Sequence, residues 1–463
     1  MTDTVVRVEG GQPERFAPYA SYRDSDIDWL SQIPADWNSH RLRFVVETRI
    51  SKKELRALDP RTEVSFVPME AIHEHGGMDL ASTKPLSDVL EGYTYFRDGD
   101  VLVAKITPCF ENGKGALAEG LCNNAGLGTT ELHVLRPSPK VDARFLLYLT
   151  LSQHFRRIGT ASMYGAGGQK RVSGDFIRNF HHPLPSLSEQ RAIADFLDRE
   201  AAKIGALVAK KERLIKLLQE KRTALITHAV TRGLDPEVPM KDSGVEWLGE
   251  MPSHWHLRPL KRVSPEITVG VVVNPSSYVS ADGVPFLYGS DVQEGRIVAD
   301  TARRMSDRDS EALSKSRLEA GDLVCVRVGA PGVTAVVPPE IAGANCASVL
   351  IVRHATSFSS QWLCYTMNSR LVRHQVELVQ YGAAQEQFNV AHAVVFLVPL
   401  PPRAEQAALA AFLDSETSEI DNLIAKIEEA VDHLNELRIA LISGAVTGKI
   451  DVREPVSRHD TEL

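Results

Sequence analysis

The chain has 463 residues, roughly three times the length of a typical domain, so we expect two to four folded units. Its 43% hydrophobic and 24% charged residues are typical of globular proteins and exclude wholesale disorder or a collagen-like repeat. No stretch approaches the roughly 20 apolar residues that a membrane-spanning helix needs, and the first residues lack the basic and apolar regions of a signal peptide. These features predict a cytoplasmic protein.

Two further counts limit the chemistry. The five cysteines are scattered and never form a Cys-x-x-Cys pair, which argues against a disulfide framework or a zinc site. The net charge of −8 would disfavour nucleic acid as a partner, yet residues 136–182 hold eight basic and two acidic side chains. A local basic region could therefore bind DNA despite the acidity of the whole chain.

The chain is an internal duplication. Two blocks recur at nearly constant offset: residues 23–37 return at 241–255, and residues 183–231 return at 399–447. The first pair keeps two tryptophans in register, and the second has 25 identities in 49 positions. Because the blocks flank divergent middles, we predict two similar halves with pseudo-twofold symmetry, each built around a variable domain.

The first middle, about residues 42–182, is predicted to be a β-rich α/β domain. Apolar runs at 101–104 and 132–135 predict strands, and residues 143–158 predict a helix. The loop at 164–173 combines glycines, a stacking aromatic ring, a glutamine able to read adenine and two cations for phosphates. A solvated glycine turn is the alternative. The candidate DNA-binding residues here are Tyr164, Gln169, Lys170 and Arg171, with Lys105, Thr107 and Lys114 near strand ends.

Both copies of the second block predict a long helix. Ser186 and Glu189 have the spacing of a capping box, and Gly233 and Gly448 are suited to end the two helices. Apolar or long-stemmed residues recur at steps of three and four, as in a coiled coil. The first copy carries this stripe from Leu197 to Leu225, and the second from Leu413 to Leu441. The two helices have opposite net charge, +3 for 188–231 and −7 for 404–447, which favours pairing into a shared antiparallel spacer over packing on their own domains.

The second middle, about residues 260–398, has the same predicted character. Strands are expected at 323–328 and 348–352, and a helix at 360–379. Gly321-Asp322 precedes the first of these strands as Gly99-Asp100 precedes the strand at 101–104. The candidate DNA-binding residues, which include fewer cations than those of the first middle, are Arg327, Tyr381, Gln385, Gln387 and Asn389.

No group of residues predicts catalysis. Residues 112–115 lack the flanking glycine and hydroxyl of a P-loop, and residues 165–168 are not a dinucleotide fingerprint. The His73-Glu-His75 segment lacks the spacing of a zinc-binding helix and is interpreted as a turn. We therefore expect no catalytic residue, no metal site and no cofactor in this chain.

At this point the chain resembles a known family. Asp242–Trp255 and the two copies of Pro-Leu-Pro-x-x-x-Glu-Gln-x-x-x-x-x-Phe-Leu-Asp, at 183–198 and 399–414, are similar to those of type I restriction-modification specificity subunits. The resemblance extends from about Tyr22 to Ile450. It implies an α/β (α+β) fold with two β-rich target-recognition domains, separated by two long antiparallel coiled-coil helices. The implied parts are an N-terminal tail (1–21), recognition domain 1 (22–185), spacer helix 1 (186–232), recognition domain 2 (233–401), spacer helix 2 (402–450) and a C-terminal tail (451–463).

The resemblance also implies partners. Each recognition domain would read one half of a bipartite site in double-stranded DNA, and the chain would direct two methyltransferase subunits and nuclease-translocase (restriction) subunits. S-adenosylmethionine, ATP and Mg would belong to those partners. Two alternatives stay open: a scaffold that assembles proteins without binding DNA, and a self-sufficient nuclease or methyltransferase, which the missing motifs disfavour.

Overall fold

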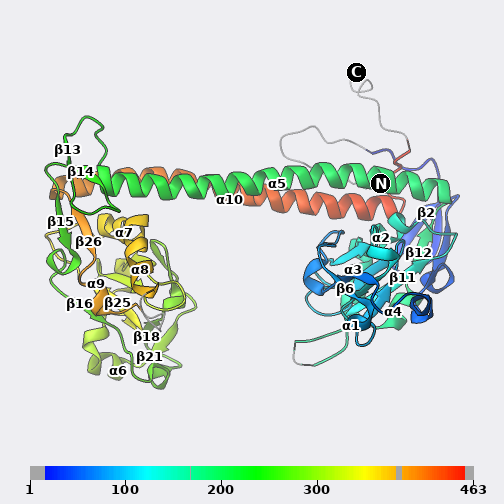
Figure 1. Cartoon of the computed structure of the whole chain (residues 1–463), viewed down its shortest axis with the longest axis horizontal. Coiled ribbons are helices and arrows are strands. Elements are labelled where there is room, and N and C mark those ends of the chain that lie inside the picture. The colour runs from blue at the N-terminus through cyan, green and yellow to red at the C-terminus, as the bar shows by residue number, and fades with distance from the viewer. Residues whose placement is uncertain (1–15, 167, 382–387, 454–463) are drawn as a thin grey trace. The chain divides into compact units, whose positions relative to one another are not determined.

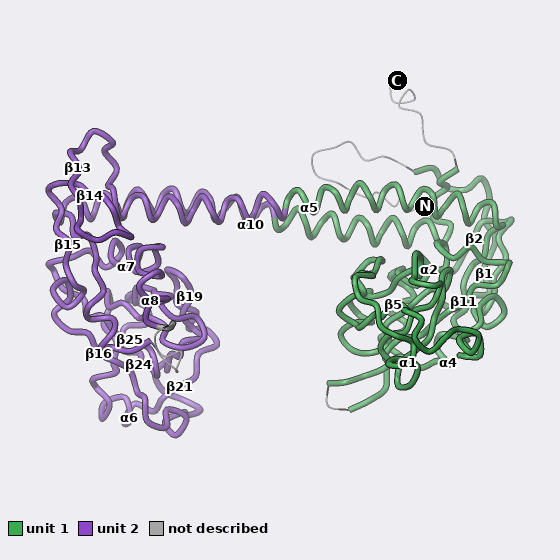
Figure 2. The backbone as a smooth tube through the Cα atoms, viewed as in Figure 1, with its two compact units in different colours: residues 1–211, 428–463 green, residues 212–427 purple. Residues whose placement is uncertain are grey.

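A computed structural model describes residues 16–166, 168–381 and 388–453 of the chain (Figure 1). The chain forms two compact units (Figure 2). Unit 1 comprises residues 1–211 and 428–463, and unit 2 comprises residues 212–427. Each unit therefore holds one variable middle and a part of each long helix. Within the described ranges, no helix is both long enough and apolar enough to cross a membrane.

Unit 1 contains two four-stranded sheets that pack around a common apolar cluster, which includes Phe96 and Leu102. One sheet has the order β6-β5-β10-β7, with β5 and β10 parallel, and the other is the antiparallel β4-β11-β8-β9. A hairpin precedes the sheets, and β3 pairs with β12. The strands are β1 (Tyr22–Ile27), β2 (Leu30–Pro34), β3 (Asn38–Arg41), β4 (Val46–Glu47), β5 (Glu63–Val67), β6 (Thr83–Pro85), β7 (Thr94–Phe96), β8 (Val101–Ala104), β9 (Gly115–Leu117), β10 (Gly126–Gly128), β11 (Leu132–Pro137) and β12 (His181–Leu184).

Unit 2 repeats this topology. Its antiparallel sheet β16-β25-β22-β23 corresponds to β4-β11-β8-β9, and β18 runs parallel to β24 as β5 does to β10. The predicted duplication and the four predicted strands, which are β8, β11, β22 and β25, are confirmed. The strands of unit 2 are β13 (Met240–Asp242), β14 (Glu250–Pro252), β15 (His256–Pro259), β16 (Ile267–Val269), β17 (Val279–Ser280), β18 (Val284–Leu287), β19 (Val292–Gln293), β20 (Arg296–Ile297), β21 (Arg303–Met305), β22 (Leu323–Val326), β23 (Thr334–Val336), β24 (Asn345–Cys346), β25 (Val349–Val352) and β26 (Leu397–Leu400).

The short helices correct the sequence analysis in one respect. The single helices predicted at 143–158 and 360–379 are each broken by a serine with extended backbone angles, Ser152 in unit 1 and Ser369 in unit 2. Ser152 Oγ accepts a hydrogen bond from Phe155 N–H and so caps the following helix. The helices are α1 (Leu86–Val89), α2 (Ala143–Leu151), α3 (Gln153–Ala161), α4 (Gly174–Asn179), α6 (Asp307–Ala312), α7 (Ser360–Asn368), α8 (Arg370–Tyr381) and α9 (Val390–Ala393).

The two long helices are α5 (Leu187–Arg232) and α10 (Arg403–Val446). Ser186 Oγ accepts from Glu189 N–H at 3.3 Å, as the capping-box spacing predicts, and Gly233 follows α5 with a φ of +79°. Every residue of the predicted stripe on α5, from Leu197 to Leu225, is buried or half-buried, whereas leucines off the stripe at 207, 214 and 217 are exposed. The buried face of α5 therefore agrees with the predicted stripe, whereas α10 ends at Val446, four residues before the predicted end of the second spacer helix.

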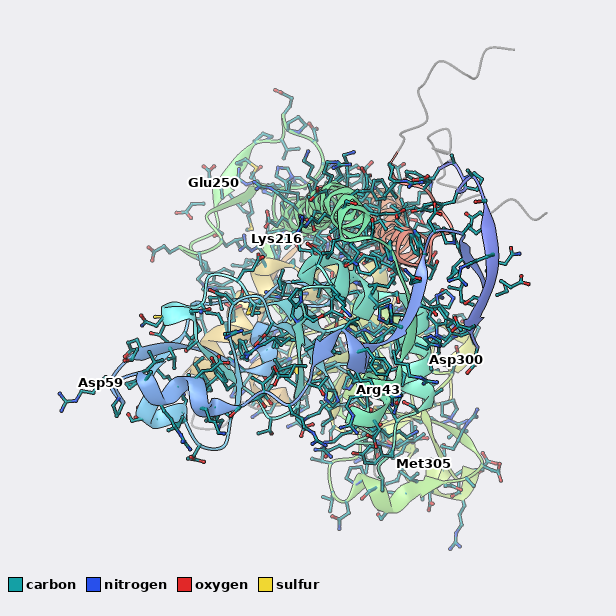
Figure 3. All side chains as sticks on the ribbon, turned by 90° about the vertical axis from the view of Figure 1, so that its right-hand side faces the viewer. Arg43, Asp59, Lys216, Glu250, Asp300 and Met305 are labelled. Atoms are coloured by element: carbon teal, nitrogen blue, oxygen red, sulfur yellow. The ribbon has the colours of Figure 1, made fainter. Side chains whose placement is uncertain are left out.

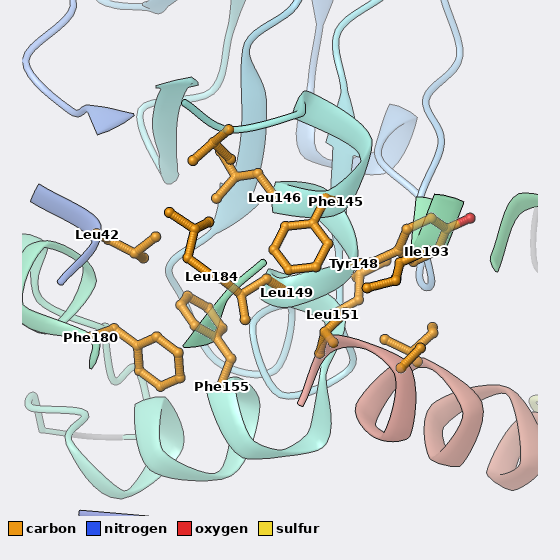
Figure 4. Close-up of a cluster of buried hydrophobic side chains, with 14 of the residues drawn as sticks. Leu42, Phe145, Leu146, Tyr148, Leu149, Leu151, Phe155, Phe180, Leu184 and Ile193 are labelled. Atoms are coloured by element: carbon orange, nitrogen blue, oxygen red, sulfur yellow. The ribbon is translucent and has the colours of Figure 1, made fainter. Parts of the chain in front are cut away.

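The pairing of the helices is antiparallel in each unit. In unit 1 the start of α5, with Ile193 and Ile204, shares a core with Leu441 near the end of α10. In unit 2 the end of α5, with Val230, shares a core with Leu413 near the start of α10. The core of unit 1 continues into the recognition domain, where Phe145, Tyr148 and Leu149 of α2 belong to the same apolar cluster as Ile193 of α5 (Figure 4). Each long helix is thus part of the hydrophobic core of both units.

Candidate nucleic-acid interface

The predicted DNA-contacting loop of unit 1 is fixed at both of its ends. Tyr164 and Arg171 exchange backbone hydrogen bonds of 3.1 and 2.9 Å, which closes the glycine-rich tip. The returning strand then pairs with the residues after β8: Val172 N–H donates to the Lys105 carbonyl at 2.8 Å, and Thr107 N–H donates to the Lys170 carbonyl at 3.0 Å. The structure therefore brings Lys105, Thr107 and the loop together, although they are far apart in the sequence.

The tip of this loop is presented to solvent. Tyr164 is 62% exposed, and Gln169 and Lys170 are also exposed. A phenol ring, an amide and an ammonium group on a clamped glycine-rich turn can stack, read a base edge and neutralise a phosphate. The local geometry is compatible with the predicted role of these three side chains.

Arg171, at the end of this loop, is paired with a carboxylate of the same unit. Its guanidinium is held in a bidentate pair by Glu131, the residue before β11, with both N–H···O distances at 2.9 Å. The hydrogen bond from Arg171 lowers the pKa of Glu131, and Glu131 raises the pKa of Arg171. Because the guanidinium has a carboxylate partner, Arg171 fixes the returning strand of the loop, and its contact with phosphate stays a prediction.

The candidates near strand ends, Thr107, Lys114 and Lys105, make contacts within the fold and present little additional surface to DNA. Thr107 Oγ1 donates to the Lys170 carbonyl at 3.3 Å, and Lys114 Nζ donates to the Met69 carbonyl at 3.2 Å. Burial lowers the pKa of half-buried Lys105, with Glu131 raising it and Arg171 lowering it. Lys105 also lines a cavity of about 300 Å³ with polar and aromatic side chains that include Lys52, Tyr93, Tyr95 and His133.

Most of the basic stretch at 136–182 is already neutralised or buried. Arg136, Arg144, Arg171 and Arg178 pair with carboxylates, and Arg156 is buried. The remaining cations, Lys140, Arg157 and Lys170, are exposed. The local charge of +6 therefore overstates the positive surface that DNA could meet.

Unit 2 places its candidates in corresponding positions. Arg327 follows β22 as Lys105 follows β8, and its Nε donates to the Phe388 carbonyl at 2.9 Å. Asn389 caps α9 by accepting from His392 N–H, so its side-chain oxygen is engaged within the fold. Tyr381 is the last residue of α8. Its side chain, together with Gln385 and Gln387, lies outside the described residues.

A buried ion pair before the central strand of each unit was not anticipated. Asp100, 1% exposed, accepts two hydrogen bonds from Arg136 at 2.7 and 2.8 Å. In unit 2, Asp322 accepts from Arg353 at 2.6 Å. Both aspartates also accept from the backbone N–H three residues earlier, which shapes the turn into β8 and into β22. The Gly-Asp echo in the sequence was the available signal for this pair, which fixes the strand that leads to Lys105 or Arg327.

Comparison with known proteins agrees with this architecture. Residues 36–216 match the family model described as the type I restriction modification DNA specificity domain. The EcoAI specificity subunit of Escherichia coli is 40% identical over 164 residues, which are 35% of this chain and 27% of that relative. The putative MjaX specificity subunit of Methanocaldococcus jannaschii is 24% identical over 445 residues, covering 92% of this chain and 96% of that relative. A chain from a structural study of type I R-M complex assembly and conformational transition has a TM-score of 0.63 at 22% identity, with 90% of this chain and 99% of that chain covered.

The matched segments are 35% and 37% of this chain, and they span only 27% and 29% of the EcoAI and EcoEI specificity subunits. The solved structure supports the fold over nearly the full length. The fold and the site define a class of proteins with an internal duplication. Each of the two β-rich units contains a part of both long antiparallel helices. Residues 36–216 therefore match the type I restriction modification DNA specificity domain, and over its full length the chain is similar to a putative type I specificity subunit at 24% identity.

Proposed function

We propose that the chain is the sequence-specific DNA-binding subunit of a type I restriction-modification complex. Each unit reads one half of a bipartite duplex site and directs adenine methylation or restriction by partner subunits. The observation that carries this proposal is the clamped loop of unit 1, which presents Tyr164, Gln169 and Lys170 at its exposed tip. In unit 2, Arg327 binds the Phe388 carbonyl at the corresponding position.

The partners follow from the same proposal. Two methyltransferase subunits would supply S-adenosylmethionine chemistry, and restriction subunits would supply ATP- and Mg-dependent cleavage. This chain contributes no catalytic residue in the proposal. Of the described residues, none form a cluster of three or more histidine, cysteine or acidic side chains that could hold a metal.

Binding to duplex DNA across a salt series tests the proposal. We expect log affinity to fall steeply with log salt, because bound phosphates release counterions, and we expect a preferred split sequence, which methylome sequencing of the source cells would identify. A scaffold that does not bind DNA would show no such dependence. Methyl transfer or cleavage by the purified chain alone would contradict the non-catalytic assignment.

A further inference from the structure

Unit 2 contains a carboxylate shared by two arginines. Glu294, in the turn between β19 and β20, accepts hydrogen bonds from Arg222 of α5 and from Arg373 of α8, each at 2.5 Å. Arg222 Nε also lies 3.0 Å from Asp421 Oδ1 on α10. The two arginines are thus balanced by two carboxylates, and this cluster attaches the hairpin to three helices.

The duplication places two arginines at the corresponding positions of unit 1 but removes the carboxylates. Arg438 corresponds to Arg222, and Arg156, four residues after Ser152, corresponds to Arg373, four residues after Ser369. The counterpart of Asp421 is Gly205, whose added Cβ would lie 3.5 Å from the Arg438 guanidinium. No salt bridge forms to Arg156 or Arg438 among the residues that the structure describes.

The corresponding hairpin of unit 1 does not supply the missing charge. Its turn contains Glu74 and His75, and Glu74 accepts from Asn112 Nδ2 at 3.0 Å, without contacting either arginine. His75 lies near both of them: burial lowers its pKa, and Arg438 and Arg156 lower it further, with Glu74 raising it. At neutral pH His75 is therefore a neutral imidazole and supplies no charge that could balance the two cations.

Arg156 is a buried cation without a counterion. Its side chain is 7% exposed, one terminal nitrogen donates to the Phe110 carbonyl at 2.8 Å, and Nε and the other terminal nitrogen have no partner within the described ranges. Burial lowers its pKa to about 9, so it remains charged at neutral pH. The guanidinium lies 4.8 Å from the centroid of the Phe110 ring, which offsets part of the cost of burying the charge, but the two unsatisfied donors remain costly.

An open cavity of about 390 Å³ lies beside this arginine in unit 1. The donors in its lining are Arg156, Arg157, Gln153, Asn112 and Thr160, and His75 also contributes. Glu111 is the one carboxylate in the lining, and it is exposed. Two guanidinium groups, two amides, of which Asn112 also donates to Glu74, and a hydroxyl offer more hydrogen-bond donors than the two oxygens of a carboxylate can accept, which favours a tetrahedral anion.

We propose that this cavity of unit 1 binds a phosphate group, which neutralises Arg156 as Glu294 neutralises Arg373 in unit 2. The phosphate is either a free ion or one of the DNA backbone. The free-ion form does not depend on the proposed DNA function, whereas the DNA form rests on it.

Thermal unfolding of the full chain in inorganic phosphate tests the site, with sodium chloride at matched ionic strength as reference. We expect phosphate to raise the Tm above the chloride value in a saturable manner. His75→Glu adds a carboxylate near both arginines, so it should raise the Tm without phosphate and abolish the phosphate response. Arg157→Ala removes an exposed donor without disturbing the core and should weaken the apparent affinity several-fold. Lys216→Ala, on an exposed part of α5 in unit 2 (Figure 3), is the matched control and should respond as wild type.

Duplex binding across a salt series then identifies the source of the phosphate. If a backbone phosphate occupies the cavity, His75→Glu lowers the log–log salt slope by about one. An unchanged slope together with a saturable phosphate response assigns a free ion. Equal Tm values in phosphate and chloride, with an unchanged slope in His75→Glu, would overturn the proposal. A wild-type chain that binds no DNA but responds to phosphate would refute the proposed function and leave this site intact.

Discussion

Tyr22 donates a hydrogen bond of 3.0 Å from its hydroxyl to the carbonyl of Gly448, a residue 426 positions later in the chain. Gly448 follows α10, and an added Cβ there would lie 2.4 Å from Pro34 and 3.2 Å from Trp37. In unit 2, Gly233 follows α5 and meets Pro252 and Trp255 in the same way. The repeated Pro-x-x-Trp block therefore covers the end of a long helix in both units. In unit 1 this contact joins residues that are 426 positions apart in the sequence.

This close contact predicts a large penalty for Gly448→Ala. Its φ of +72° strains any residue with a Cβ by roughly 1–2 kcal/mol, and overlap with Pro34 adds roughly 1–3 kcal/mol. Gly244→Ala is the matched control, because its φ is +75° but nothing lies within 4 Å of the added Cβ. Urea unfolding should show a loss about twice as large at Gly448. Equal losses would mean that the contact with Pro34 and Trp37 contributes nothing.

The assignment of the buried face of α5 can be tested at two residues that lie one turn apart on this helix. Ile204 is 4% exposed and Leu207 is 47% exposed. Ile204→Asp should lower the free energy of unfolding by about 3 kcal/mol or more, since a carboxylate would be buried without a partner. Leu207→Asp should change it by less than about 1 kcal/mol. Similar effects in the two variants would refute the assignment of the buried face.

The loop of unit 1 predicts different effects for two adjacent cations. Lys170 is exposed, so Lys170→Ala should weaken binding to all duplexes and reduce the log–log salt slope by about one. Arg171 is paired with Glu131, so Arg171→Ala should disturb the loop without the same change in slope. Fluorescence anisotropy on specific and scrambled duplexes from low to high salt separates the two outcomes. A slope change for Arg171→Ala equal to that for Lys170→Ala would restore Arg171 as a phosphate contact.

Gln169 should affect sequence preference and not general affinity. Its amide can accept and donate to one adenine edge, so Gln169→Ala should cost roughly 1–3 kcal/mol on the specific duplex and leave binding to scrambled DNA unchanged. A panel of single base-pair substitutions in the site would locate the position at which discrimination relaxes. If discrimination is unchanged at every position, the loop positions the protein without reading a base.

His182 should make the stability of unit 1 depend on pH. It is fully buried in β12, and burial lowers its pKa to about 4, while the hydrogen bond with the Pro183 carbonyl raises the pKa and His40 and His181 lower it. The unfolded chain has an ordinary histidine pKa of about 6.5 and takes up the proton first, so stability is lost as the pH falls from about 6.5 toward 4. The slope from this residue should approach 1.4 kcal/mol per pH unit. Chemical unfolding at several pH values should show a flatter profile for His182→Gln; parallel profiles would contradict the assignment.

The elements that depend on neighbouring residues in the sequence could be predicted from residue patterns. The strands β8 and β25 and both ends of α5 follow from apolar runs, caps and glycines. The break at Ser152 was missed because the apolar pattern continues across it, and only the cap on Phe155 N–H reveals the new helix. The roles of individual cations could not be predicted either, because they depend on contacts between residues far apart in the sequence. Arg171 pairs with Glu131, which is 40 residues away in the sequence, and Arg156 on α3 is buried. A count of charges in the sequence therefore could not distinguish these two arginines from the exposed Lys170.

The contact between Tyr22 and Gly448 has a consequence for folding during synthesis. Unit 2 is one continuous segment, so all of its core residues have been synthesised once residue 427 is added. Unit 1 takes core side chains from α10, including Leu441 and Val446, and therefore cannot complete its core until nearly the whole chain has been made. Domains generally fold as units, beginning at the N-terminus as the chain emerges. We therefore expect the opposite order in this chain, with unit 2 folding before unit 1, whose core is completed only when α10 has been synthesised.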